Sequence, residues 1–286
     1  MGLIGGSVAL ALKKAAMLDN TTTHIVGVGR GLNGLEMAKS LGVIDSMADN
    51  TPASIHAACS DADVILIAAP VAQTASILAS IQPHLNKQTV ITDAGSTKGD
   101  VLACAKQVLG AQFSQFVGGH PIAGAEKSGV TAAKADLFSG KNVVLTPTAE
   151  TKPDAIKTVA TLWQTCGAKV SEMSAENHDG IFSAVSHLPH LLAFALVNEI
   201  ANRPNAAQLF SFAASGFRDF TRIAGSSPEM WRDVSLANKT ALLQDLTVFE
   251  GQISHLKQLL ANNDGIGLQA LFEAASVARN DWAKTK

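Results

Sequence analysis

The chain has 286 residues, enough for one large domain or two smaller ones, and 47% of them are hydrophobic, which excludes a disordered chain. The formal net charge of −2 provides no basic surface for a phosphate backbone, so we expect no nucleic-acid partner. The three cysteines are scattered and include no CxxC pair, which predicts a reducing, cytoplasmic environment without structural disulfides.

The first predicted element is an apolar helix within residues 1–18. Its lysines follow the apolar run, unlike those of a signal peptide, and the run is too short to cross a bilayer, so we expect no membrane contact. The helix opens on GLIGGS, and an apolar strand follows at 24–30. This order is typical of the second half of the dinucleotide-binding pattern GxGxxG, whose glycines admit a pyrophosphate at a helix N-terminus. The candidate cofactor contacts here are Gly2, Leu3, Ile4 and Gly5.

The first half of that pattern is missing from the sequence. Its first glycine and its strand, which is normally central in the sheet, would lie before Met1, as in a chain whose start is placed too late. We therefore expect a sheet without that strand, a chain of low stability and a weakened cofactor site.

Apolar runs then alternate with helical patterns. The predicted strands are 61–70, 89–93, 116–117, 142–146 and 168–173, and the helices between them include 35–41, 71–81 and 153–167. This alternation predicts a doubly wound α/β sheet of the Rossmann type with mostly parallel strands. Ligands of such sheets bind beyond the carboxyl ends of the strands. The candidate residues at these ends are Arg30, Ala69, Pro70, Ser96 and His120.

Beyond Ala175 the strand signal stops and only helices are predicted. The stretch 181–201 is apolar on nearly all sides, which predicts a buried helix. A second helical pattern starts at Ser227 and runs to about 260, with a break expected near Gly251, and a last helix holds 268–282. The sequence therefore predicts a dinucleotide-binding domain at 1–173 and an all-α domain at 174–286. Because the helices have more apolar faces than one layer can bury, we expect the all-α domain to form a homodimer.

Arg30 follows the strand at which NAD-binding sheets usually carry an acidic residue for the ribose hydroxyl. An arginine there would meet a 2′-phosphate, so the sequence favours NADP over NAD. The alternative is a solvated loop arginine.

The segment VGGHPIAGAEKSG places His120 between two glycines and a proline. Pro121 restricts the backbone, so we expect His120 on a stiff, tightly turned loop after the strand. Imidazole titrates near neutral pH and is the commonest general base. The same segment is also compatible with a histidine that only stabilises the loop.

Other candidates are less specific. Ser96 lies in the loop DAGSTKG, where it would help to orient His120 or cap the next helix. In SHLPH, His187 and His190 lie three residues apart on one helix face, without an evident third ligand, so we expect no metal. Arg222 would clamp a substrate carboxylate, and Trp231 would wall the pocket or belong to the core.

Taken in order, GLIGGS, DAGSTKG, GGHPIAGAEKSG, SHLPH and GFRDFTRIAGSSPEMWRD resemble the prephenate/arogenate dehydrogenase family of tyrosine biosynthesis. The resemblance covers nearly the whole chain. It implies the oxidative decarboxylation of a cyclohexadienol, with hydride transfer to NAD or NADP. It further implies that His120 draws the proton of the substrate hydroxyl, that Ser96 supports this geometry and that Arg222 binds a carboxylate. The residues that it places along the pocket are His187, His190, Gly216 and Trp231.

Ala125 departs from the family pattern, because many members have a hydroxyl residue there, so the choice between prephenate and arogenate is left open. Two alternatives also remain. A hydroxyacid-type dehydrogenase of two domains would need a catalytic lysine in the helical half, where Lys239 is the candidate. A non-catalytic nicotinamide sensor or inactive remnant would bind cofactor without turnover.

Overall fold

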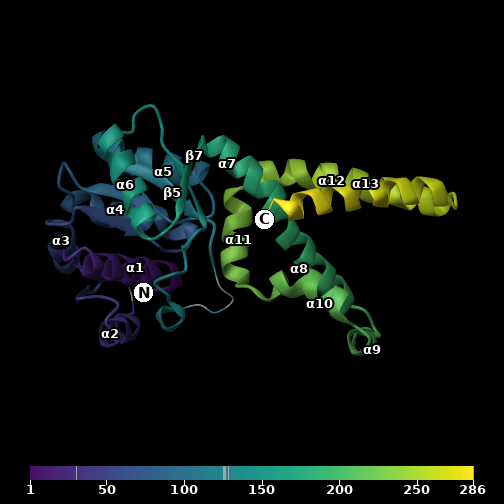
Figure 1. Ribbon diagram of the computed structural model, residues 1–286, viewed down its shortest axis with the longest axis horizontal. Coiled ribbons are helices and arrows are strands. Elements are labelled where there is room, and N and C mark those ends of the chain that lie inside the picture. Colours follow the sequence, from purple (N-terminus) through teal and green to yellow (C-terminus); the bar gives the residue numbers. More distant parts are fainter. Residues whose placement is uncertain (30, 125–126, 128, 286) are drawn as a thin grey trace. The chain divides into compact units, whose positions relative to one another are not determined.

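The computed structural model describes residues 1–29, 31–124, 127 and 129–285 (Figure 1). The chain divides into two compact units, Met1–Asn238 and Lys239–Lys286, and each is described by itself. The sequence predicted a domain boundary at residue 173, which differs from the division at Asn238, and the two predicted domains stay a prediction.

The described strands of the first unit form two sheets. A short parallel pair consists of β1 (Val26–Val28) and β2 (Ser46–Ala48). The larger sheet has the order β3-β4-β5-β6-β7, which are Val64–Ile67, Val90–Asp93, Phe116–Pro121, Asn142–Thr146 and Lys169–Glu172. Its neighbours are parallel except for β5 and β6, which are antiparallel.

Helices cover both faces of the larger sheet. They are α1 (Leu3–Leu18), α4 (Thr74–Ile81), α5 (Gly99–Leu109) and α6 (Pro153–Thr165). The helix α3 (Pro52–Cys59) packs into the same core as α4 and α5, and α2 (Leu32–Ser40) packs against β1 and β2. Successive strand residues point to opposite faces, so Phe116 joins the core below α4 and α5, while Val117 joins the core formed with α1 and α6. This arrangement confirms the doubly wound α/β class.

The division into two sheets falls between β1 and β3, which do not pair in the described structure. In the strand order 3-2-1-4 of a dinucleotide-binding sheet, these two strands flank the position of the first strand. The side chains Val64, Ile65 and Leu66 of β3 are accordingly only partly buried, whereas every residue of the neighbouring β4 is buried. The short strand β2 was not predicted.

Helices complete the first unit. They are α7 (Ala175–Phe182), a π-helical turn at Ser183–His187, α8 (Leu188–Ala201), α9 (Ala206–Ser211), α10 (Ser215–Thr221) and α11 (Pro228–Ala237). The stretch Ala175–Ala201 is the one helical segment among the described residues that is long and apolar enough to cross a membrane, judged by length and composition alone. Only 17% of its most apolar window is buried, so the buried helix predicted for 181–201 is not seen in the single chain.

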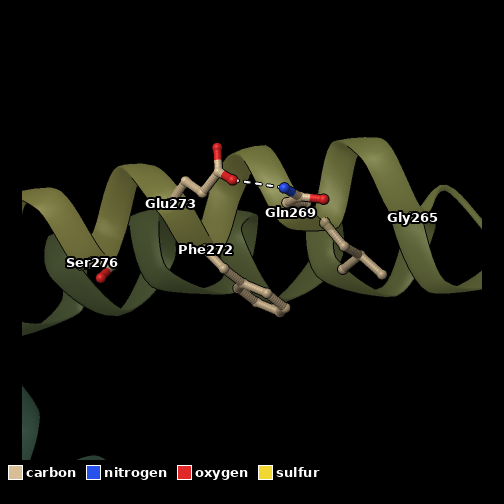
Figure 2. Close-up of a pocket in the computed structure, with 6 residues that line it drawn as sticks. Gly265, Gln269, Phe272, Glu273 and Ser276 are labelled. Atoms are coloured by element: carbon tan, nitrogen blue, oxygen red, sulfur yellow. Dashed lines mark hydrogen bonds between the residues drawn. The ribbon is translucent and has the colours of Figure 1, made fainter.

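The second unit consists of α12 (Lys239–Ala261) and α13 (Gly265–Lys284), which pack against each other. The break expected near Gly251 is wrong, because α12 continues through that exposed glycine and the helices instead separate at Asn238. A surface hollow of about 480 Å³ lies along α13 (Figure 2). Its lining residues are Gly265, Leu268, Gln269, Phe272, Glu273 and Ser276, none of which is a predicted site residue.

Candidate active site

The start of α1 offers free backbone donors. Gly2 is its N-cap, no side chain caps the helix, and no acidic residue lies in its first turn. The first intrahelical bond runs from Gly6 N to Gly2 O at 2.9 Å, so the N–H groups of Leu3, Ile4 and Gly5 precede it. A Cβ on Gly5 would lie 3.4 Å from the Ala68 side chain at the end of β3. The helix start thus fits a pyrophosphate beside this strand end.

The end of β4 adjoins the same region as the end of β3. Ala69 and Pro70 lead from β3 into a short turn at Val71–Gln73, and this turn contacts α11. The loop after β4 packs on it, since a Cβ on Gly95 would lie 2.9 Å from Val71. The ends of β3 and β4 therefore lie together, whereas Arg30, which was predicted to join them, lies outside the described residues.

A buried ion pair holds the loop after β4 against β5. Lys98 pairs with Asp93, and its ammonium group also donates to the Gly119 carbonyl at 2.8 Å. The Asp93 carboxylate accepts from Gly95 N at 2.8 Å and from Gly119 N at 3.0 Å. These bonds fix the backbone directly before His120.

The prediction that His120 lies on a tightly turned loop is wrong. His120 is the penultimate residue of β5 and lies opposite Val144 of β6. Both residues before His120 belong to the strand, and they must be glycines because no side chain fits there. A Cβ would lie 2.4 Å from Thr146 Oγ1 at Gly118 and 2.7 Å from the Asp93 carbonyl oxygen at Gly119. The imidazole is held edge-to-face against Phe182, with ring centroids 4.8 Å apart.

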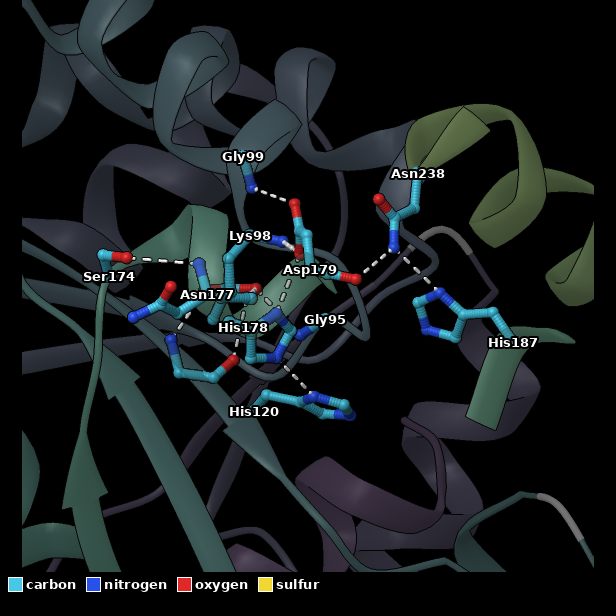
Figure 3. Close-up of polar contacts among 12 residues, drawn as sticks. Gly95, Lys98, Gly99, His120, Ser174, Asn177, His178, Asp179, His187 and Asn238 are labelled. Atoms are coloured by element: carbon cyan, nitrogen blue, oxygen red, sulfur yellow. Dashed lines mark hydrogen bonds and ion pairs between the residues drawn. The ribbon is translucent and has the colours of Figure 1, made fainter. Parts of the chain in front are cut away.

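His120 heads a chain of hydrogen bonds that ends at α5 (Figure 3). Its Nδ1 lies 2.8 Å from Nε2 of the fully buried His178, and Nδ1 of His178 lies 2.8 Å from Oδ1 of Asp179. The Asp179 carboxylate also accepts from Lys98 N at 2.9 Å and from Gly99 N at 2.8 Å. Asp179 thus caps α5, in place of the predicted Ser96 hydroxyl.

The environment sets the charge of both ends of this chain. Burial, and then the electrostatic influence of His178, Lys98 and His187, hold the pKa of His120 well below its ordinary value. Burial by itself raises the pKa of Asp179, but hydrogen bonds from His178 and from the two N–H groups of α5 outweigh it and lower the pKa overall. His120 is therefore neutral and Asp179 ionised at neutral pH.

The two histidines of SHLPH face Trp231. His190 stacks on the indole with ring centroids 3.6 Å apart, and His187 meets it edge-on at 6.0 Å. Asn238 bridges His187 Nδ1, at 3.1 Å, and the Asp179 carbonyl, at 2.8 Å. Burial lowers the pKa of His187 to about 4, and a hydrogen bond joins it to the backbone of Ser96. Ser96 is thereby connected to His187 and not, in the described contacts, to His120.

Arg222 starts the 3₁₀ turn that follows α10. Burial, and after it the charge of Arg222, lower the pKa of His190, which places the guanidinium near the histidine pair. Gly216 lies exposed in α10, where an added Cβ would meet nothing within 4 Å. Arg30 and Ala125 lie outside the described residues. Within those residues, no three His, Cys, Asp or Glu side chains are arranged to hold a metal ion.

Sequence reasoning missed His178, Asp179 and Asn238. They belong to no recognisable motif, and their partners lie 51 to 81 residues away in the chain. The one local signal is Ser174, which caps α7 and so places this His–Asp pair in its first turns.

Comparisons with known proteins match both halves of the chain. Residues 8–172 match the prephenate dehydrogenase nucleotide-binding domain, and residues 174–274 match the prephenate dehydrogenase dimerization domain. The prephenate dehydrogenase of Bacillus subtilis is 40% identical over 98% of this chain and 74% of its own length. The cyclohexadienyl dehydrogenase of Zymomonas mobilis is 34% identical over 98% of this chain and 92% of its own length.

Two solved structures are similar over nearly the whole chain. The prephenate dehydrogenase from A. aeolicus in complex with hydroxyphenyl propionate and NAD+ superimposes with a TM-score of 0.90 at 35% identity, covering 98% of this chain and 95% of that one. The Synechocystis arogenate dehydrogenase reaches a TM-score of 0.80 at 27% identity, covering 99% of this chain and 97% of that one.

Proposed function

Because the chain belongs to the prephenate dehydrogenase family, we propose that it converts prephenate to 4-hydroxyphenylpyruvate and CO₂, an oxidative decarboxylation that supplies tyrosine biosynthesis. The chain is thus an oxidoreductase. Arogenate, which would give tyrosine, is the alternative substrate, and Ala125, which lies outside the described residues, favours neither.

The observation that carries the proposal is the state of His120. Burial holds its pKa well below the ordinary value, Nδ1 is engaged by His178, and among the described contacts none involves Nε2, which is proposed to meet the substrate. In the proposed reaction His120 Nε2 takes the proton of the ring hydroxyl as hydride leaves the same carbon. A nicotinamide, when bound, accepts that hydride. The C–CO₂ bond then breaks, its electrons make the ring aromatic, and the proton returns to the phenolate oxygen.

The remaining site residues orient the substrate. Arg222 is proposed to bind a carboxylate, beside the stacked pair of His190 and Trp231. His187 and Ser96 are proposed to hold the loop next to the nicotinamide, and Gly216 to border the pocket. Since aromatisation drives the reaction, orientation and one base are sufficient help from the protein.

Steady-state kinetics with prephenate and arogenate, each with NAD and NADP, test the proposal. We expect His120→Asn to lower kcat by at least about 1,000-fold without changing the cofactor Kd. Arg222→Gln should mainly raise the substrate KM. Replacement of Lys239 by Met serves as the control, because only the hydroxyacid-type alternative needs that lysine. Cofactor binding without turnover of either substrate would favour the sensor alternative.

For the cofactor, we propose that the start of α1 holds the pyrophosphate and that Arg30 favours NADP. The unsatisfied N–H groups of α1 support the first part, and the charge of Arg30 supports the second. We expect Arg30→Ala to lower kcat/KM for NADP at least about tenfold and to leave kcat/KM for NAD within about twofold. Equal losses for both cofactors would contradict the role of Arg30.

We further propose that the chain is a cytoplasmic homodimer. The match of residues 174–274 to a dimerization domain supports the dimer, as do the partly uncovered apolar side chains of α8.

A further inference from the structure

We propose that Asp179 and His178 are positioning residues that fix the tautomer of His120, so that the lone pair of His120 is always on Nε2. The role in turnover rests on the proposed function, whereas the tautomer is a property of the free protein. The argument starts at the buried end of the hydrogen-bond chain and proceeds to the base (Figure 3).

Asp179 can only accept hydrogen bonds. Its two oxygens receive the N–H groups of Lys98 and Gly99 at the start of α5, at 2.9 and 2.8 Å. These donors and the helix dipole favour the ionised carboxylate. An ionised carboxylate has no proton to give, so the 2.8 Å contact with His178 requires that Nδ1 of His178 carries the hydrogen.

His178 passes this constraint on to His120. In its neutral form His178 has one N–H group, and since Nδ1 carries it, Nε2 is the acceptor in that form. Nε2 lies 2.8 Å from Nδ1 of His120, which therefore donates. Nε2 of His120 is then unprotonated and ready to accept a proton. In the opposite tautomer Nε2 would carry a hydrogen, and His120 could not act as the base.

Packing keeps the three groups in line. His178 is fully buried, and Phe182 lies against both imidazoles, with ring centroids 4.5 Å from His178 and 4.8 Å from His120. Asn238, the residue directly after α11, holds the Asp179 backbone by a 2.8 Å hydrogen bond. The other charged or titratable groups that act on the pair are Lys98, from the loop before α5, and His187, from the π-helical turn. Neither offers an acceptor to His178 in the described contacts, so Asp179 is the group that orients it.

The first test measures the tautomer directly by ¹⁵N NMR of histidine-labelled free protein, with the His120 signals assigned by their loss in His120→Asn. We expect Nδ1–H for His120 in the wild type and a mixture of tautomers in Asp179→Leu, which fills the space without an acceptor. Nε2–H in the wild type, or an unchanged tautomer in a folded Asp179→Leu variant, would refute the proposal. This result needs no substrate, so it is independent of whether prephenate is turned over.

The second test separates positioning from simple structural support. Phenylalanine in place of His178 fills the space without an acceptor, whereas a glutamine carbonyl can still accept from His120 Nδ1. We expect His178→Phe to lower kcat by about 100- to 10,000-fold, by analogy with loss of the orienting carboxylate in a catalytic triad, with KM and cofactor Kd within about threefold. His178→Gln should retain at least tenfold more kcat than His178→Phe.

The matched control is His56→Phe, on the exposed side of α3, which should keep the wild-type kcat. Equal losses in the Phe and Gln variants of His178, or a loss below threefold in both, would show that His178 does not position the base. If the wild-type protein turns over neither substrate, the proposed function fails and the NMR result alone decides the present proposal.

Discussion

His187 shows how a single buried side chain makes the stability of the protein depend on pH. Burial lowers its pKa from 6.5 to about 4, so between these values the unfolded chain binds more protons than the folded one. The stabilisation is complete above pH 6.5 and is lost as the pH falls towards 4. We expect the free energy of unfolding to drop by about 2 kcal/mol from this group between pH 7.5 and pH 5.

Urea unfolding of wild type and His187→Gln at both pH values measures this contribution. The variant should lose about 2 kcal/mol of the pH dependence, because glutamine does not titrate. His255→Gln, at an exposed position of α12, should retain the wild-type dependence. The same pH dependence in wild type and His187→Gln would show that His187 is not held neutral by the fold.

Single residues also mark the limit of what the sequence predicts about the site. His120, His187, His190 and Trp231 were recognisable because they stand in distinctive segments, and the structure brings the last three together around one indole ring. The partners of His120 were not recognisable. A His–Asp pair inside a helix carries no pattern, and its contact with β5 arises only when α7 folds against the sheet.

At the level of elements, β5 depends on its two glycines. Gly119 passes so close to β4 that a Cβ would lie 2.7 Å from the Asp93 carbonyl oxygen, which is backbone and cannot rotate away. We expect Gly119→Ala to push the two strands apart, to lower stability by about 1–3 kcal/mol and to lower kcat at least tenfold through displacement of His120.

Thermal unfolding and kcat of the purified variant check this expectation. Gly251→Ala is the control, because a Cβ there meets nothing within 4 Å and alanine favours a helix. Unchanged Tm and kcat in Gly119→Ala would mean that β4 and β5 adjust without cost.

The elements also show why some predictions failed. Long apolar runs such as 61–70 predicted their strands well, whereas β2 is only three residues long and has no apolar run. The direction of β6 was not predictable, because the described part of the connection between β5 and β6 holds no helix longer than one turn, and so no crossover of the kind that makes neighbours parallel. The helix break falls at Asn238 instead of Gly251, since the side chain of Asn238 is committed to His187 and Asp179.

On the scale of the whole molecule, the exposed apolar surface of the second unit leads us to expect a partner chain. Among the described residues of the second unit, Leu242 and Leu259 are the only buried apolar ones. Large apolar side chains remain exposed along both helices: Leu243, Val248, Ile253, Leu260, Ile266, Phe272, Val277 and Trp282. A two-helix hairpin gains too little burial to be stable without a further apolar layer. Because residues 174–274 match a dimerization domain, we expect that layer to come from a second copy.

Light scattering coupled to size-exclusion chromatography tests this expectation. The wild type should have a mass of about 59 kDa, twice the 29.7 kDa of one chain. The double variant Val248→Glu/Phe272→Glu places two charges on side chains that are 68% and 57% exposed, and it should shift the mass towards one chain. Gln258→Glu adds charge to α12 without removing an apolar side chain and should remain dimeric. A wild-type mass of one chain at micromolar concentration would mean that the exposed apolar side chains are not covered by a second copy.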